Sequence, residues 1–344
     1  MILVWLATAF LLAICASLLI APLVIGSAHA LKLYDSPDGA RRVHDVAVPR
    51  LGGIAVFLSA AAVGIVVLIL AEHIFLPAGD SRASEVRFLL GVFLGSALLF
   101  LVGLVDDVMD LSPAVKSLAQ IIAALVAYSY GARLDNIALG YGVGVSTGLI
   151  ELPLLILWIV GVTNAYNFID GLNGLAGGIA IVASATIVIV ALALGNLTVL
   201  IPAVALAGAL FGFLHFNFPK ARLFLGDSGS MSVGFLLAVM SLHASVNRSG
   251  AVLVIVPLLA VFVPLMDGAL AIIRRWLRRV PLSGADARHI HHRLLALGLT
   301  QQRAAIVLWV VAASMAGFGL LIALTAPFVA TSIALLGLVG VAAL

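Results

Sequence analysis

Apolar runs recur along the whole chain and are separated by short segments rich in Gly, Pro and charged residues. Many of these runs approach the roughly 20 residues that a helix needs to cross about 30 Å of hydrocarbon. Because the intervening segments are short, the pattern leaves no separate soluble domain. We therefore predict an all-α polytopic membrane protein with about eleven transmembrane helices. Their expected bounds are about 2–25, 51–71, 86–105, 117–131, 149–163, 175–194, 197–215, 229–246, 251–272, 304–323 and 326–344.

The composition agrees with this pattern, since 64% of the residues are hydrophobic and only 10% are charged. Soluble domains are about half apolar and about a quarter charged. The first apolar run has no Lys or Arg ahead of it, so we expect a retained helix rather than a signal peptide. The only cysteine, Cys15, lies in that run, which excludes disulfides and cysteine-based metal sites. We expect residues 1–344 to form one integral membrane domain.

Positive charge is divided unevenly between the two predicted membrane faces. One face holds 14 of the 18 Lys and Arg residues, in segments 26–50, 106–116, 164–174, 216–228 and 273–303. By the positive-inside rule this face is cytoplasmic, with the N-terminus outside and the C-terminus inside. On the other face, the Gly-rich stretch 134–151 predicts a small external β-hairpin.

The first polar cluster contains Asp106, Asp107 and Asp110 at the end of an apolar run, followed by Lys116. On a continuing helix, Asp106 and Asp110 share a face. Adjacent carboxylates repel one another, so the cluster predicts either a Mg²⁺ site or a carboxylate that acts as a base. A solvated helix end is the alternative, although acids at a helix C-terminus oppose the helix dipole.

The second cluster contains Asn164, Asn167, Asp170 and Asn173 at intervals of three residues. Gly171 and Gly174 lie in the same stretch. This spacing keeps the first three on roughly one side of a helix, and glycines let the backbone approach a ligand. Neutral amides beside one acid favour a nucleotide and metal-phosphate site. Polar contacts between helices are the alternative, but they explain four positions in register poorly.

The third cluster, Gly226-Asp227-Ser228-Gly229-Ser230, comes just before another apolar run. Backbone N–H groups at a helix N-terminus can bind phosphate while Asp227 holds a metal ion. A helix cap followed by small packing residues is the alternative.

The fourth cluster lies in the basic segment 273–303 and contains His289, His291, His292 and Arg293. Imidazole and guanidinium groups together can bind phosphate charge. A zinc site is an alternative, but the segment has neither a thiolate nor a His-Glu-x-x-His motif. We expect the four arginines that open the segment to contact anionic lipid.

Taken in order, these clusters resemble the motifs of the polyprenyl-phosphate N-acetylhexosamine-1-phosphate transferase family. The resemblance covers nearly the whole chain. Asp110 and the His-x-His-His form are similar to the bacterial branch that uses UDP-N-acetylhexosamines, whereas Asn173 stands where many members have Asp. The match begins in the first basic segment with Asp35, Pro37, Arg41, Arg42, His44, Pro49, Gly52 and Gly53.

The resemblance implies transfer of an N-acetylhexosamine 1-phosphate from a UDP-linked donor to undecaprenyl phosphate. The favoured sugar phosphate is GlcNAc-1-phosphate. UMP would be released in an active site formed by the five segments of the basic face. The reaction would be the first membrane step of a cell-envelope glycan pathway. The resemblance implies Mg²⁺, with Mn²⁺ as an alternative, held by Asp227, Asp170 and Asn167. The expected catalytic residues are Asp106, Asp107, Asp170 and His289. The expected substrate contacts are Asn164, Asn173, Lys116, Asp110, Arg42, His44, His291, His292, Arg293 and Gly226.

Further expectations concern Asp267 and the partners. Asp267 matches a Pro-x-x-Asp position of the family, and we expect it to pair with the arginines that follow it. We expect contacts with membrane lipids and none with nucleic acid, and a homodimer is left open.

Two other functions are considered: the same chemistry with another UDP-amino sugar, and secondary transport. A transporter predicts charges near helix centres and a repeat between halves, whereas here the acids lie at helix ends and no repeat is detected.

Overall fold

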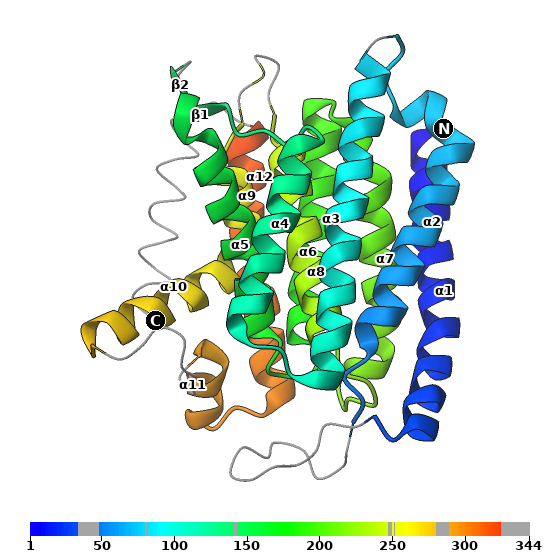
Figure 1. Ribbon diagram of the computed structural model, residues 1–344, viewed down its shortest axis with the longest axis vertical. Coiled ribbons are helices and arrows are strands. Elements are labelled where there is room, and N and C mark those ends of the chain that lie inside the picture. The colour runs from blue at the N-terminus through cyan, green and yellow to red at the C-terminus, as the bar shows by residue number, and fades with distance from the viewer. Residues whose placement is uncertain are drawn as a thin grey trace.

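The computed structural model describes residues 1–33, 48–79, 81–140, 143–246, 250, 252–279 and 289–324. Over these ranges the chain forms twelve α-helices, most of them side by side, and one small β-hairpin (Figure 1). Short 3-10 helices, η1 (Gly148–Ile150) and η2 (Leu197–Val199), precede α5 and α7. The helices are α1 (Ile2–Leu31), α2 (Gly52–Phe75), α3 (Ser81–Met109), α4 (Pro113–Ser129), α5 (Glu151–Ile169), α6 (Leu175–Leu194), α7 (Leu200–Asn217), α8 (Gly226–Ala244), α9 (Ile255–Ala260), α10 (Phe262–Leu277), α11 (Ile290–Ala296) and α12 (Gln301–Leu324).

Seven of the described helices are long and apolar enough to cross a membrane. They are α1, α2, α3, α5 with η1, α6, α7 with η2, and α12, and α4 is apolar but shorter. The predicted all-helical membrane fold is thus confirmed for the described part of the chain, whereas the number of about eleven crossings stays a prediction. The last expected helix, 326–344, lies outside the described residues.

Helix α8 lies inside the bundle and packs against α2, α3, α5 and α6. Nearly all of its residues are buried. Because this helix is surrounded by protein, it can contain the small and polar residues that a lipid-facing helix avoids. Ser232, for example, donates its hydroxyl to the carbonyl of Ser228 one turn earlier, at 2.6 Å. The Gly- and Ser-rich sequence that follows Asp227 therefore forms the central helix of the fold.

The single helix predicted over 251–272 is wrong, because the structure divides this region into α9 and α10. The break falls at Val261, whose backbone leaves the helical region at φ −112° and ψ 26°. Pro264 has no N–H to donate to the carbonyl of Ala260, so the hydrogen bond that would carry a helix across this point is missing. Helix α10 then leaves the bundle sideways (Figure 1).

The predicted β-hairpin is confirmed. Strands β1 (Asn136–Gly140) and β2 (Val143–Ser146) pair antiparallel, with Asn136 opposite Ser146. The Thr147 hydroxyl donates to the carbonyl of Leu134 at 2.8 Å and closes the base of the hairpin. The hairpin lies at the end of the bundle opposite α11 (Figure 1).

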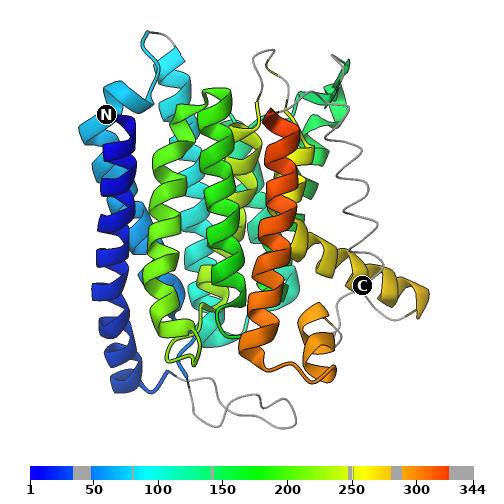
Figure 2. The same cartoon turned by 180° about the vertical axis from the view of Figure 1, so that it is seen from behind.

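The polar clusters gather at the other end of the bundle. Helix α3 ends there and α4 begins there, next to the C-terminus of α5 and the N-terminus of α8 (Figure 1). Seen from behind, α11 and the start of α12 lie at the same end (Figure 2). We call this region the polar end of the bundle. Segments that are far apart in the sequence meet there because the helices alternate in direction.

Close packing of α3 on α8 gives the first testable prediction. A β-carbon added at Gly103 would lie 2.5 Å from the carbonyl carbon and oxygen of Asp227. Since backbone atoms cannot move aside locally, we expect Gly103→Ala to separate the helices and lower stability by about 1–3 kcal/mol. Gly161→Ala in α5 is the matched control, because nothing lies within 4 Å of its added β-carbon. Thermal unfolding in detergent measures both variants, and equal melting temperatures would contradict the prediction.

Candidate active site

Lys116 joins carboxylates from two helices at the polar end. It lies in the first turn of α4, and its Nζ is 3.1 Å from Oδ2 of Asp106 at the end of α3. The same Nζ is 2.8 Å from Oδ2 of Asp227 in the first turn of α8. The other oxygen of Asp106 accepts the backbone N–H of Leu111 at 2.7 Å. One ammonium group therefore offsets the repulsion between two acids that the fold brings together.

Asp107 caps the start of α8 with both of its carboxylate oxygens. Oδ1 accepts the N–H of Asp227 at 2.7 Å, and Oδ2 accepts the N–H and hydroxyl of Ser228 at 3.1 and 2.6 Å. A carboxylate at a helix N-terminus is favoured by the helix dipole and by these charge-assisted hydrogen bonds. Asp107 thus holds the backbone of Asp227 and so fixes the position from which the Asp227 side chain extends.

Gly226 has no room for a side chain at this junction. Its φ is +73°, and an added β-carbon would lie 1.9 Å from the carbonyl oxygen of Arg50 and 2.7 Å from both oxygens of Asp107. Both the left-handed backbone and the close approach require glycine. The need for glycine at position 226 therefore has a local physical cause, and its expected substrate contact stays a prediction.

Asp110 does not share a helical face with Asp106, as the sequence pattern predicted. Helix α3 ends at Met109, and Asp110 has a φ of +50°. Its side chain is exposed. The expectation failed because it assumed that the helix continues past the pair of acids.

The second polar cluster supplies two residues to this site. Asn167 donates its side-chain N–H to Oγ of Ser230 at 3.0 Å and also hydrogen-bonds Asp227. Asp170 follows directly after α5, where burial and the carboxylates of Asp227 and Asp107 raise its pKa to about 7. The backbone N–H of Gly226 and the charge of Arg50 act in the opposite direction. Asp170 is therefore poised to exchange a proton near neutral pH.

Asn164 has a different environment from Asn167 and Asp170. It exchanges two hydrogen bonds with the amide of Gln120 in α4, at 3.2 and 2.7 Å. It also donates to the carbonyl of Val160 at 3.0 Å. These contacts join α4 to α5, which is the helix-joining alternative considered for this residue. Gln120 was not predicted, although a glutamine within an apolar helix is a usable signal.

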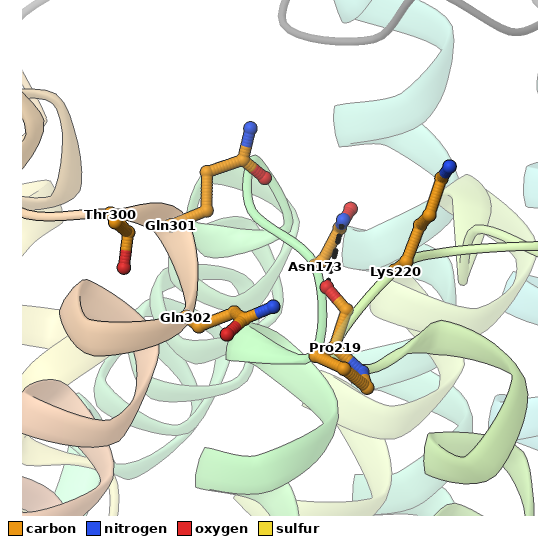
Figure 3. A pocket seen from close by; sticks show the side chains of 6 residues that line it. All are labelled: Asn173, Pro219, Lys220, Thr300, Gln301 and Gln302. Carbon is orange, nitrogen blue, oxygen red and sulfur yellow. Dashed lines mark hydrogen bonds between the residues drawn. The ribbon is translucent and has the colours of Figure 1, made fainter.

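Asn173 lines a cavity of about 360 Å³ at the polar end (Figure 3). Its side-chain N–H donates to the carbonyl of Pro219 at 3.4 Å. Nearby, Asn217 accepts the N–H of Gly174 at 2.7 Å and donates to the carbonyl of Leu223 at 2.8 Å, which holds the two loops together. Asn217 was missed because a single Asn at a helix end is a weak signal. The other residues lining the cavity are Pro219, Lys220, Thr300, Gln301 and Gln302.

The histidines lie beside the Asp170 segment. His291 is buried, and its Nε2 is 2.8 Å from where a β-carbon on Gly171 would be. Burial and the charge of His292 lower the pKa of His291 to about 4, so this ring is neutral near pH 7. The ring of His289 lies parallel to that of His291, with centroids 5.7 Å apart. The fold thus brings the second and fourth clusters together at the polar end of the bundle.

The structure gives Asp267 a different partner from the expected arginines. Its Oδ2 is 2.8 Å from Nδ1 of His289, and its Oδ1 accepts the N–H of Ile290 at 2.7 Å. The sequence pattern missed this pairing because it treated 251–272 as one straight helix. Arg293, at the end of the histidine motif, is exposed. Arg42 and His44 lie outside the described residues.

The carboxylate oxygens at the polar end suit a Mg²⁺ ion that is only partly held by protein. Among the described residues, no group of three or more His, Cys, Asp or Glu side chains has the geometry of a metal site. Mg²⁺ commonly binds one or two carboxylates together with waters and substrate phosphates. Asp227 and Asp106 both contact the ammonium group of Lys116. The negative charge of Asp227 also contributes to the raised pKa of Asp170. This set of oxygen atoms suits a metal that is completed by phosphate.

Comparison with known proteins identifies the family. Residues 89–245 match glycosyl transferase family 4. The chain is 34% identical to the probable undecaprenyl-phosphate N-acetylglucosaminyl 1-phosphate transferase of Bacillus subtilis, over 88% of this chain and 81% of that protein. This chain belongs to that family of polyprenyl-phosphate GlcNAc-1-phosphate transferases. It is therefore a multi-pass membrane enzyme of glycosyl transferase family 4.

Two further relatives of this transferase differ in the lipid that their names give. The decaprenyl-phosphate N-acetylglucosaminephosphotransferase of Mycobacterium tuberculosis is 36% identical, over 78% of this chain and 71% of that protein. The undecaprenyl-phosphate alpha-N-acetylglucosaminyl 1-phosphate transferase of Escherichia coli is 27% identical, over 84% and 76%. The relatives thus share the sugar and the lipid phosphate class but not the lipid length.

The cap on α8 can be tested with Asp107→Asn. An amide offers one acceptor oxygen, and its NH₂ group would face N–H donors, so at least one buried hydrogen bond is lost. We expect stability to fall by about 1–3 kcal/mol and turnover to fall as well, because Asp227 shifts. Thermal unfolding and product release measure the two effects. Asp110→Asn, at an exposed position, is the stability control, and a melting temperature for Asp107→Asn as high as that of the control would refute the capping role.

The pKa of Asp170 predicts how stability changes with pH in the absence of a divalent cation. A folded pKa of about 7 lies above the ordinary value, so between about pH 4 and about pH 7 the folded chain keeps a proton that the unfolded chain has lost. Stability should therefore fall as pH rises through this window. Thermal unfolding in EDTA at a series of pH values measures the slope. We expect a smaller slope in Asp170→Asn, and identical slopes would contradict the assignment.

Proposed function

We propose that this transferase moves GlcNAc 1-phosphate from UDP-GlcNAc to undecaprenyl phosphate. The observation that carries the proposal is the group of four carboxylates at the polar end, Asp106, Asp107, Asp170 and Asp227, of which Asp106 and Asp227 contact Lys116. The chain that carries this group is 34% identical to its relative from Bacillus subtilis. The names of the three relatives support GlcNAc as the sugar. Two of those names support undecaprenyl phosphate as the acceptor.

In the proposed reaction, an oxygen of the lipid phosphate attacks the β-phosphorus of the donor. The bond from that phosphorus to the bridging oxygen breaks, and UMP leaves with the bond's electron pair. Because two anions must meet, positioning and charge neutralisation are the main contributions that the protein can make. Lys116 supplies positive charge between Asp106 and Asp227.

The chain's carboxylates have separable roles in this proposal. Asp107 is engaged by the N-terminus of α8, so it positions Asp227. Asp106, which contacts Lys116, is then the member of the pair that orients the acceptor phosphate. Asp227 and Asp170, with Asn167, would hold Mg²⁺ or Mn²⁺. The bound ion would neutralise diphosphate charge.

His291 lies against Gly171 and the cavity is lined by Asn173, so both are close to Asp170 in the chain, and this region would bind the rest of the donor. His289, His292 and Arg293 would contact phosphate oxygens, and Asn173 would lie near the uracil ring. The basic segments at the polar end favour the cytoplasmic side of the membrane. A soluble nucleotide donor is available there.

Release of UMP tests this proposal directly. Purified protein in detergent is given UDP-GlcNAc, undecaprenyl phosphate and Mg²⁺, and each component is withheld in turn. We expect UMP only when all three are present, and we expect Asp227→Asn to lower the rate by about 100-fold or more. Asp135→Asn is the matched control, because Asp135 is exposed beside β1 at the opposite end of the bundle.

Each contrary outcome has a defined meaning. UMP released without the lipid would indicate hydrolysis of the donor. UMP released only with a different UDP-amino sugar would keep the reaction and change the donor. Absence of UMP with a panel of UDP-sugars would overturn the proposed function.

A further inference from the structure

Asp267 is a buried acid that the proposed reaction does not use. Its exposed fraction is only 1%, and it lies in α10, outside the cluster of carboxylates around Lys116. Both of its oxygens have partners: Oδ2 is 2.8 Å from Nδ1 of His289, and Oδ1 accepts the N–H of Ile290 at 2.7 Å. A buried charge is retained only when it is paired and hydrogen-bonded. The pairing with His289 is thus the reason that an acid can occupy this position.

These two contacts fix both the place and the protonation pattern of the His289 ring. A carboxylate can only accept hydrogen bonds, so Nδ1 of His289 must carry a hydrogen. Any change in the protonation of this ring then takes place at Nε2, on the far side from Asp267. The rings of Phe168 and His291 stack near His289, with centroids 5.9 and 5.7 Å away. The ring is therefore held by its neighbours as well as by the carboxylate.

We propose that Asp267 is a positioning residue that keeps the hydrogen of His289 on Nδ1 and so presents Nε2 to a phosphate oxygen of the substrate. This inference rests on the proposed function, because the phosphate is that of the donor or the acceptor. In the neutral ring Nε2 carries the lone pair, so it can accept the proton of a phosphate hydroxyl, and the imidazolium that forms is stabilised by Asp267 and donates Nε2–H back to that oxygen. Asp267 itself touches neither substrate.

Asp267→Asn separates this role from a purely structural one. The Oδ1 of asparagine can still accept the N–H of Ile290, so the start of α11 keeps its hydrogen bond. Its NH₂ group, however, faces Nδ1 as a donor, and a neutral His289 must then carry its hydrogen on Nε2. The variant therefore changes which ring nitrogen is protonated while it changes the shape of the site very little.

The tautomer can be measured without any activity. Nitrogen NMR of histidine-labelled protein distinguishes protonated Nδ1 from protonated Nε2, and His289→Gln assigns the signal among the eight histidines. We expect protonated Nδ1 in the wild type and protonated Nε2 in Asp267→Asn at a pH where the ring is neutral. The same tautomer in both proteins would overturn the inference.

Kinetics supply the second measurement. We expect Asp267→Asn to lower kcat by about 100-fold while KM for the donor changes less than about threefold. Asp267→Asn should have no further effect in the His289→Ala background, because Asp267 acts through that ring. Asp135→Asn is again the matched control and should keep the wild-type kcat. An unchanged kcat in Asp267→Asn, or additive losses in the double variant, would overturn the inference. A wild type that releases no UMP would instead overturn the proposed function, and the NMR measurement would still decide the tautomer.

Discussion

The structure depends on how it compensates four carboxylates at the polar end of a bundle of largely apolar helices. Lys116 offsets Asp106 and Asp227, and the N-terminus of α8 offsets Asp107. Burial raises the pKa of Asp170, and the nearby negative charge of Asp227 and Asp107 raises it further. Carboxylates this close together would otherwise destabilise the fold. The incomplete compensation is also what makes the polar end suitable for a cation and anionic phosphates.

The central position of α8 follows from the same constraint. Its N–H groups can compensate Asp107 only if α3 and α8 approach closely, and Gly103 and Gly226 permit that approach. A helix enclosed by protein does not need an apolar surface, so α8 can be rich in Gly and Ser. Close packing of α3 on α8 and the compensation of charge at the polar end therefore depend on the same small residues around Asp227.

The histidines reach the site by a different route. The break at Val261 turns α10 out of the bundle, and α11 returns to the polar end, where Asp267 meets His289. His291, against Gly171, connects this group to the segment that carries Asp170. Gly171 and His291, which meet at this contact, are 120 residues apart in the sequence. Their meeting depends on a kink that removes one hydrogen bond from a helix.

The order of the apolar runs and the spacing of the polar clusters determined the helical membrane fold, the hairpin and the membership of the transferase family. These features are local, because hydrophobic length and residue spacing act within one helix or loop. The pairing of Asp267 with His289, the capping of α8 by Asp107 and the link from Gln120 to Asn164 could not be predicted in this way. Each joins residues on different helices, so it depends on where a helix ends or bends. Asp110 shows the limit clearly: its spacing from Asp106 predicted a shared face, and only the end of α3 decided otherwise.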